Sequence, residues 1–305
     1  MGQLACARDV PNPRTRIDMA PKFFPIHVSV IICTYRRDRV LVETVDQVLA
    51  QADGLAEIVI VDQKAQHDLT TREYIKTKCN EGLIRYFNLE VAGLTHARNF
   101  GATQACGAVL LFCDDDVILS PNWIREHMAM YEDQQVSAVA GQVLSVGGQP
   151  MPTCSALHGA NFSVRKSVYE SIGGSDENLG VHAYTEDWIL AHRLLTGAHR
   201  ISYCPSASVV HLMSPVGGCR INDRTQPTKE WEKPYSKLYW LHLNPPREMS
   251  KWLRLLWEAV RHGPLRKDAV ICFWRQPAAW SGFIMSYCKA RSAVRNSQYR
   301  VNRIR

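Results

Sequence analysis

Apolar runs rich in β-branched residues recur through the first part of the chain, and segments of helical length separate them. The runs are residues 27–35, 57–62, 83–89 and 108–116, and the helical segments are 40–50, 69–78 and 95–105. Strands that alternate with helices at this spacing predict βαβ units, in which a parallel sheet is buried on both faces. The sequence therefore predicts an α/β fold with a Rossmann-like, mixed but mostly parallel sheet flanked by helices.

The pattern continues less regularly to about residue 215. Here the sequence predicts a helix, a strand, a strand–helix–turn segment, a second helix and two short strands, at 122–132, 136–143, 159–174, 185–197, 201–203 and 208–211. We therefore divide the chain into a loose leader at 1–25, a main α/β domain at 26–215 and a helical C-terminal extension at 216–305. Residues 251–263 carry a helical pattern within that extension.

The cysteines and the hydropathy of the chain indicate in which cellular compartment we expect the protein. None of the ten cysteines forms a Cys-x-x-Cys pair, which favours reduced thiols over a zinc or redox site. The sequence shows no signal peptide and no run of about 18 apolar residues that could span a bilayer. We therefore expect a cytoplasmic protein, either free or peripheral at the inner membrane surface.

The C-terminal extension carries the positive charge. Residues 220–305 contain 18 Lys or Arg against 6 Asp or Glu, whereas the whole chain has a net charge of +7. Six tryptophans lie among these cations: Trp231, Trp240, Trp252, Trp257, Trp274 and Trp280. A basic helix with an apolar face can lie on an anionic membrane, but it can equally pack its apolar face on the main domain. Both alternatives stay open at this point.

Asp114, Asp115 and Asp116 follow directly after the apolar run at 108–113. Three adjacent carboxylates repel one another unless a cation lies among them, and Mn²⁺ or Mg²⁺ prefers oxygen ligands that include substrate phosphates. The alternative is a solvated acidic turn before the next helix. Because ligands bind beyond the carboxyl ends of the strands in open α/β sheets, we expect Asp114 and Asp116 to bind a metal and a diphosphate-bearing ligand.

Other strand ends supply groups suited to a nucleotide. Asp62 ends the second run and can accept hydrogen bonds from a base or a ribose, and Thr34 and Tyr35 end the first. Arg98 and Asn99 lie near the start of the helix at 95–105, where we expect Arg98 to meet the base or diphosphate and Asn99 the sugar hydroxyls.

Two later segments carry further candidates. Glu186 and Asp187 open a helix, where its dipole favours carboxylates, but a carboxylate in a cleft also suits a general base; Asp187 is the first choice and Glu186 the second. His211 ends the last short strand and becomes a third metal ligand if that strand returns to the aspartates. We assign Gly159, Asn161 and Trp188 to the acceptor side of the site.

Several motifs, in their order along the chain, resemble the family 2 glycosyltransferases of the GT-A fold. They are VSVIICTYRR, EIVIVDQ, GLTHARNFGATQACGAVLLFCDDD, GANFSVRKSVYESIGGSDENLG and TEDWILAHRLL, and they span about residues 27–212. The resemblance implies that Asp62 and Arg98 hold the nucleotide, that Asp114 and Asp116 bind the ribose and a divalent cation, and that the Glu186–Asp187 pair supplies the base.

The resemblance also implies the reaction and its participants. One sugar would move from a nucleotide-sugar donor to a hydroxyl of a glycan or lipid-linked acceptor, with inversion at the anomeric carbon. Gln63, Cys33 and Arg36 depart from the commoner residues of the family at their positions, which bears on the base that is bound. The Gln-x-x-Arg-Trp motif of processive synthases is absent from the sequence, so we expect a single transfer per encounter.

Two alternatives compete with this interpretation. A nucleotidyltransferase that activates a sugar phosphate would share the sheet and the metal, but it is expected to have a glycine-rich loop after the first strand, and CTYRRDRV has no glycine. A nucleic-acid-binding protein would use the basic extension, but no recognised nucleic-acid motif supports it. We therefore expect no nucleic-acid partner.

Overall fold

A computed structural model describes residues 27–51, 55–63, 66–151, 155–179, 183–218, 229–243 and 284–293, and positions 250, 253, 256, 257 and 260. The expected leader at 1–25 lies outside the described residues, as does most of the helix expected at 251–263. The main domain is described almost throughout, so the expectations for its elements can be compared with the structure.

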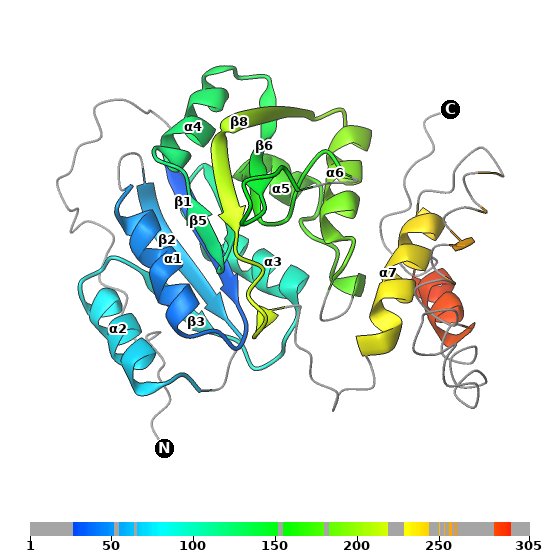
Figure 1. Ribbon diagram of the computed structural model, residues 1–305. Coiled ribbons are helices and arrows are strands. Elements are labelled where there is room, and N and C mark those ends of the chain that lie inside the picture. The colour runs from blue at the N-terminus through cyan, green and yellow to red at the C-terminus, as the bar shows by residue number, and fades with distance from the viewer. Residues whose placement is uncertain are drawn as a thin grey trace.

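The described residues form an eight-stranded mixed sheet in the order β3-β2-β1-β4-β7-β6-β8-β5 (Figure 1). Its parallel half consists of β1 (Val28–Thr34), β2 (Leu55–Asp62), β3 (Arg85–Asn88) and β4 (Val109–Asp114). In the other half, β7 (Asn161–Arg165) runs antiparallel to β4 and to β6 (Val136–Leu144), β8 (Arg200–His211) runs parallel to β6, and β5 (Val117–Leu119) runs antiparallel to β8. The predicted mixed, mostly parallel α/β fold is confirmed.

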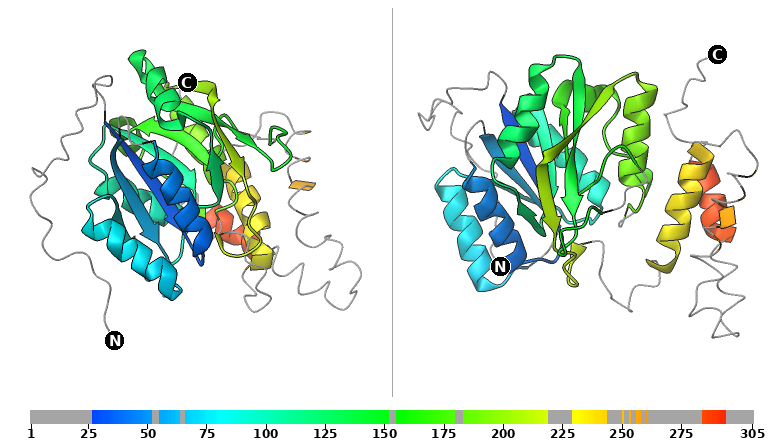
Figure 2. Two further views of the ribbon diagram at one scale, coloured as in Figure 1. Left: turned by 60° about the vertical axis from the view of Figure 1, so that its left-hand side comes forward. Right: turned by 45° about the horizontal axis from the view of Figure 1, so that its top comes forward.

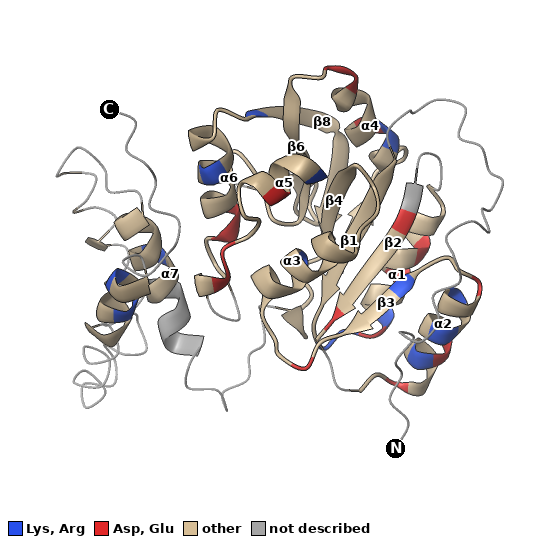
Figure 3. Cartoon of the chain, turned by 180° about the vertical axis from the view of Figure 1, so that it is seen from behind, with Lys and Arg blue, Asp and Glu red and all other residues tan. Residues whose placement is uncertain are grey.

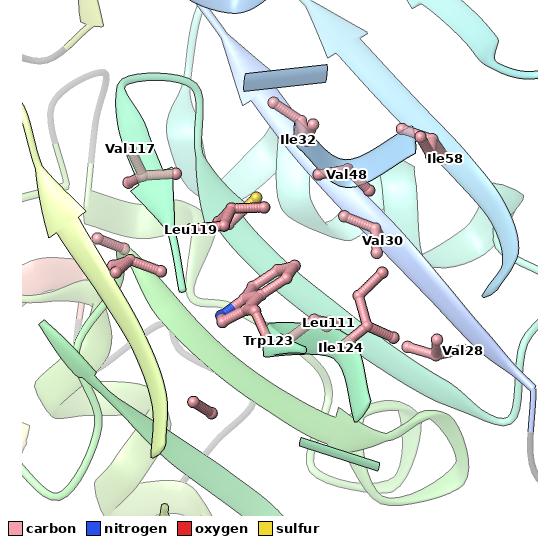
Figure 4. Close-up of a cluster of buried hydrophobic side chains, with 14 of the residues drawn as sticks. Val28, Val30, Ile32, Val48, Ile58, Leu111, Val117, Leu119, Trp123 and Ile124 are labelled. Atoms are coloured by element: carbon pink, nitrogen blue, oxygen red, sulfur yellow. The ribbon is translucent and has the colours of Figure 1, made fainter. Parts of the chain in front are cut away.

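Helices cover both faces of the sheet (Figure 2). One hydrophobic cluster joins the sheet to α1 (Arg39–Leu49), α2 (Leu69–Asn80) and α4 (Trp123–Ala129), with Trp123 fully buried among valines, leucines and isoleucines (Figure 4). The other joins it to α3 (Leu94–Gln104), α5 (Lys166–Ser171) and α6 (Glu186–Thr196). Successive strand residues point to opposite faces, so uninterrupted apolar strands supply both clusters.

The boundaries differ from the expectations at two places. The run at 108–116 does not form one strand, because β4 ends at Asp114 and Asp115–Asp116 turn the chain into β5. The two short strands expected at 201–203 and 208–211 are one strand, β8, whose pairing with β6 shifts register between Gly141 and Gln142. The shift spans Pro205, which has no N–H for a ladder hydrogen bond and interrupts the strand pattern in the sequence.

The C-terminal extension packs on the main domain through α7 (Lys229–Leu243). The short helix η2 (Glu177–Leu179) of the main domain contributes to this contact. Leu238 and Tyr239 of α7 are fully buried against a cluster that includes Leu179 and Ile189. The helical residues 284–293 lie beside α7 and add Ala290 to the same cluster (Figures 1 and 2). This part of the extension therefore shares a hydrophobic core with the main domain.

Candidate active site

Polar side chains meet where β1, β2 and β4 end. In the parallel ladders Thr34 pairs with Asp62, Cys33 with Asp114, and Asp62 with Asn88 of β3. The carboxyl ends of these four strands therefore lie along one edge of the sheet, which is where open α/β folds bind ligands.

The three adjacent aspartates have different surroundings. Asp115 is buried; it accepts a hydrogen bond from Thr34 Oγ1 at 2.5 Å and lies 3.3 Å from Arg37 Nη1. Burial raises the pKa of Asp115 to about 7, although the charge of Arg37 opposes the rise. The middle aspartate thus faces β1 and the loop after it and binds the Thr34 hydroxyl, while the expected contact of Thr34 with the nucleotide remains a prediction.

Asp114, Asp116 and His211 converge into a group suited to a metal. One ligand atom from each residue lies within 4.8 Å of the other two. His211 Nε2 is 3.1 Å from Asp116 Oδ1 and 3.4 Å from Asp114 Oδ2. Two carboxylate oxygens and one imidazole nitrogen suit Mn²⁺, and the oxygens also suit Mg²⁺. β8 does return to the aspartates, as the expectation for His211 required, because β5 pairs His211 with Val117 directly after the acidic turn.

Arg37 is a buried cation that the sequence argument did not single out. Its Nη1 lies 2.7 Å from Asp116 Oδ2, opposite the oxygen that faces His211. Burial alone would raise the pKa of Asp116, but His211 and Arg37 together hold it below its ordinary value. The only signal in the sequence was the cationic turn YRRDR after the first strand, which does not tell which arginine turns inward.

The segment after β8 lies against this arginine. Ser214 donates its backbone N–H to Asp116 Oδ2 at 2.9 Å, and Gly218 donates its own to Tyr35 O at 2.7 Å. A side chain at Gly217 would meet Arg37 Cγ at 2.6 Å, and its φ of 78° is in the left-handed region. Two chain segments far apart in the sequence therefore hold the Asp116 carboxylate from both sides.

A cavity of about 610 Å³ lies beside the ends of β1, β2 and β3. Tyr35 contributes to its lining, as expected, together with Arg36, Gln63, Gln66, Asn88, Leu89 and Glu90. Asp62 is fully buried next to this lining; Tyr86 donates its hydroxyl hydrogen to Asp62 Oδ2 at 2.7 Å, and His67 Nε2 contacts the same oxygen. The size of the cavity and its polar groups are compatible with a nucleoside.

Arg98 lies in the interior, between two sets of carboxylates. It forms an ion pair with Glu186, and its Nη2 lies 3.8 Å from Asp114 Oδ1 and donates a hydrogen bond to Gly159 O at 2.8 Å. Burial alone would lower the pKa of Arg98, but the charges of Glu186 and Asp114 raise it, so it stays protonated. Its expected contact with the nucleotide remains a prediction, while its contact with Glu186 is a feature that the sequence did not reveal.

The side-chain amide of Asn99 forms hydrogen bonds within the fold. Its Nδ2 donates to Ser175 O and to Glu177, and its Oδ1 accepts from Tyr169 Oη and Ser175 N, all at 2.7 to 2.9 Å. These internal bonds use its amide to fix the turn after α5, and the expected contact of Asn99 with sugar hydroxyls remains a prediction.

Glu186 and Asp187 start α6, but their carboxylates are not equivalent. Glu186 is buried and paired with Arg98, whereas Asp187 accepts a hydrogen bond from the backbone N–H of Trp188 at 3.0 Å. Burial and the neighbouring charge of Glu186 raise the pKa of Asp187 to about 7. A carboxylate with this pKa can take up a proton near neutral pH, which is the property of a general base.

The three residues assigned to the acceptor side have different surroundings in the structure. Gly159 lies against the ion pair, since a Cβ there would meet Glu186 Oε1 at 2.2 Å. Trp188 is half-buried beside Trp240 of α7, with ring centroids 6.2 Å apart. Asn161 is fully buried, donates to Ala207 O at 2.8 Å and accepts from Trp123 Nε1 at 2.9 Å, so its assignment to the acceptor side is corrected to a role inside the fold.

The extension contacts the main domain close to α6. Tyr239 donates its hydroxyl hydrogen to Asp176 Oδ2 at 2.9 Å, and Thr185, which precedes Glu186, donates to Ser236 O at 3.3 Å. Other residues of the extension face outward: Leu253, Trp257, Ile284 and Met285 are each more than half exposed. Lys and Arg residues also occur on the described helices of the extension (Figure 3). Among the described residues, none of the helices has the length and apolar character needed to cross a bilayer.

The sheet and its flanking helices have the GT-A architecture, and solved structures of GT-A glycosyltransferases share this fold. The TM-score is 0.55 with TarS residues 1–349 of S. aureus in complex with UDP-GlcNAc, at 17% identity over 90% of this chain and 93% of that one. It is 0.54 with the mannosyltransferase PcManGT of Pyrobaculum calidifontis in complex with GDP-Man and Mn²⁺, at 15% identity over 92% and 78%.

A family model matches part of the sequence. Residues 29–174, just under half of the chain, match the model of glycosyl transferase family 2. A glucosyl-dolichyl phosphate glucuronosyltransferase of Haloferax volcanii is 28% identical over 186 residues, 50% of this chain and 57% of the relative. The O-antigen chain rhamnosyltransferase WbaN of Salmonella anatum is 22% identical over 191 residues, 53% and 58%. The chain thus matches little more than half the length of these relatives, and the family favours a transferase over the two alternatives.

Proposed function

We propose that this protein transfers a single sugar from a nucleotide-sugar donor to an acceptor hydroxyl, with inversion at the anomeric carbon and with Mn²⁺ or Mg²⁺ bound by Asp114, Asp116 and His211. One observation carries the proposal. Asp114 faces His211 with one carboxylate oxygen and Arg98 with the other, and Arg98 pairs with Glu186. A group suited to a metal and the carboxylates of α6 are therefore joined through one buried arginine.

Each part of this arrangement has a task in the transfer. The nucleoside occupies the cavity beside Tyr35 and Asp62, so that its diphosphate extends toward the acidic turn. Asp114, Asp116 and His211 would hold a divalent cation, which would supply positive charge to stabilise the leaving diphosphate. Asp187 accepts the proton of the attacking acceptor hydroxyl, and Arg98 holds the adjacent Glu186 in place. A single displacement of this kind inverts the anomeric centre.

The acceptor that we propose is a glycan or lipid-linked saccharide, at the inner surface of a membrane or in the cytoplasm. The names of the Haloferax and Salmonella relatives, a dolichyl phosphate glycosyltransferase and an O-antigen chain transferase, support this class of acceptor. Trp188 and Gly159, next to Asp187 and Glu186, are the proposed contacts on the acceptor side.

Donor hydrolysis tests the proposed function. The wild-type protein, incubated with UDP-, GDP- and dTDP-sugars and Mn²⁺, should slowly release a nucleoside diphosphate from one of them, and EDTA should stop the release. With an acceptor, NMR of the product should show the inverted anomeric configuration. Release of pyrophosphate instead, or a product with retained configuration, contradicts the proposal.

Peripheral membrane attachment is a second proposal, carried by the exposed apolar residues of the basic extension. Trp257 and Ile284 are each 58% exposed, beside a segment with a large excess of cations. Wild-type protein should co-sediment with phosphatidylglycerol vesicles more than with phosphatidylcholine vesicles. Trp257→Glu and Ile284→Glu should weaken this binding, while Val146→Glu, at a position 70% exposed on the main domain, should not. Equal sedimentation of all four proteins rules out attachment through the extension.

A further inference from the structure

His67 joins two carboxylates behind the cavity at the ends of β1, β2 and β3. Its Nδ1 lies 2.7 Å from Asp38 Oδ1, its Nε2 contacts Asp62 Oδ2, and only 4% of its side chain is exposed. Tyr86 donates its hydroxyl hydrogen to the same Asp62 oxygen at 2.7 Å. His67 and Tyr86 together therefore fix the plane of the Asp62 carboxylate.

The geometry requires a proton on both nitrogens of His67. Ionised carboxylates only accept hydrogen bonds, and an imidazole has two N–H donors only in its charged form. Burial on its own would lower the pKa of His67, but the hydrogen bonds and charges of Asp62 and Asp38 outweigh burial and raise it. The charged form is thus the one that satisfies both contacts at once.

The titratable groups near His67 come from three parts of the fold. Asp38 precedes α1, Asp62 ends β2, and Tyr86 belongs to β3, where burial raises the pKa of its phenol and keeps it neutral. Asp68 gives its backbone N–H to Asp38 Oδ1 at 3.2 Å and turns its own carboxylate to the N–H of Thr71. Asp38 and Asp62 are therefore the carboxylates that contact the imidazole.

The group formed by His67, Asp38 and Asp62 adjoins the residues that line the cavity. Gln63 follows Asp62, Gln66 precedes His67, and Asn88 pairs with Asp62 in the β2–β3 ladder; all three line the cavity. A change in the orientation of the Asp62 carboxylate is thus transmitted to a wall of the cavity through residues bonded or paired to it.

We propose that His67 is a positioning residue for nucleotide recognition: as an imidazolium between Asp38 and Asp62 it holds the Asp62 carboxylate in place for an N–H donor of the base of a nucleoside diphosphate. The inference rests on the proposed function, in which Asp62 contacts the nucleotide. A neutral imidazole keeps only one of the two hydrogen bonds. Affinity for the nucleoside diphosphate therefore falls as the pH rises through the pKa of His67, which lies above its ordinary value of 6.5.

Calorimetric titration with UDP and with GDP, from about pH 6 to about pH 9, tests the inference on full-length protein. We expect His67→Gln to weaken binding of the preferred nucleotide by roughly threefold to tenfold at the acid end and to remove most of the pH dependence. Asp38→Asn should move the fall in affinity to lower pH, since it removes one of the two charges that raise the pKa of His67. In transfer assays the KM for the donor should rise more in His67→Gln than kcat falls.

His96→Gln is the matched control, because His96 is an exposed histidine with a single carboxylate partner, Glu177. It should bind UDP and GDP as the wild type does at every pH. Equal affinities and equal pH profiles of wild type and His67→Gln, with equal thermal unfolding, overturn the inference while leaving the proposed function intact. A wild type that binds these nucleotides but releases none from nucleotide sugars contradicts the proposed function alone, and one that binds neither overturns both.

Discussion

Glu186 and Asp187 are neighbours at the start of α6, and the structure gives one of them a guanidinium partner and the other none among the described residues. Arg98 pairs with Glu186, whereas the Asp187 carboxylate is bound by the N–H of Trp188. The consequence is a division of tasks: the arginine holds the Glu186 carboxylate in place, and Asp187 has a pKa of about 7 that suits proton transfer.

Asp187→Asn should therefore abolish transfer while sparing donor binding. We expect kcat to fall by roughly 10²- to 10⁴-fold, the usual contribution of a general base. In the wild type, kcat/KM should rise with pH as Asp187 loses its proton near its pKa of about 7. Steady-state kinetics across this range test both points. Glu170→Gln, a substitution of an exposed carboxylate on α5, is the control, and a loss of activity in it equal to that of Asp187→Asn would refute the assignment.

Asp116→Ala should remove metal binding, whereas Asp115→Asn should preserve it. The reason is geometric, because Asp116 belongs to the group with Asp114 and His211, and Asp115 points to Thr34 and Arg37. Calorimetry with Mn²⁺ alone should show the loss in the first variant and near-normal uptake in the second. Similar uptake by Asp116→Ala and the wild type contradicts the assignment of the metal site.

Gly159→Ala should damage the site through its ion pair. Its Cβ would lie 2.2 Å from Glu186 Oε1 and 3.2 Å from Arg98 Nη2, so the pair must move. We expect about 1–3 kcal/mol lower stability, typical of overpacking, and a lower kcat. Gly147→Ala has no comparable neighbour and is the matched control in chemical denaturation and kinetics. Two variants with the same stability and kcat would show that the pair adapts without cost.

His127 should make the protein less stable in mild acid. Its ring is fully buried, 2.9 Å from Asn161 Oδ1 and 3.0 Å from Ser163 Oγ, and burial lowers its pKa from 6.5 to about 4. The unfolded chain therefore binds a proton between these pH values that the folded one does not, so stability falls as the pH falls from 6.5 toward 4. The loss should reach about 3 kcal/mol.

Urea denaturation at several pH values measures this loss. His127→Gln removes the titrating group, so its stability should be lower near neutral pH but should depend less on pH across the same window. His199→Gln controls for the removal of a partly exposed histidine. Parallel pH profiles for the wild type and His127→Gln would show that other groups cause the acid loss.

The sequence predicted the sheet well because strands buried on both faces leave uninterrupted apolar runs. It also predicted that Asp114, Asp116 and His211 would meet, since two of them end elements on the ligand side of the sheet. It did not reveal that the amides of Asn99 and Asn161 form hydrogen bonds within the fold. Their partners, such as Ser175 and Ala207, lie far along the chain, and a single sequence carries no trace of such pairings.

Arg37 and His67 were missed for a related reason. Both lie in polar loops after strands, where side chains usually face solvent, and only the meeting of β1, β2 and β4 with their loops buries them. Likewise, nothing in the hydropathy of residues 229–243 tells whether their apolar face meets a membrane or a protein; the structure shows Tyr239 and Leu238 inside a shared core.

The acidic turn joins β4, in the middle of the sheet, to β5, at its far edge, with only Asp115 and Asp116 between them. Because β5 is held by β8 and by α1, an ion bound by Asp114, Asp116 and His211 would tie β4, the last strand of the parallel half, to β8 and β5 at the far edge of the sheet. Uptake of the cation should therefore raise the melting temperature of the whole domain in proportion to the logarithm of its concentration, so that simple thermal scans can rank the ions this enzyme prefers.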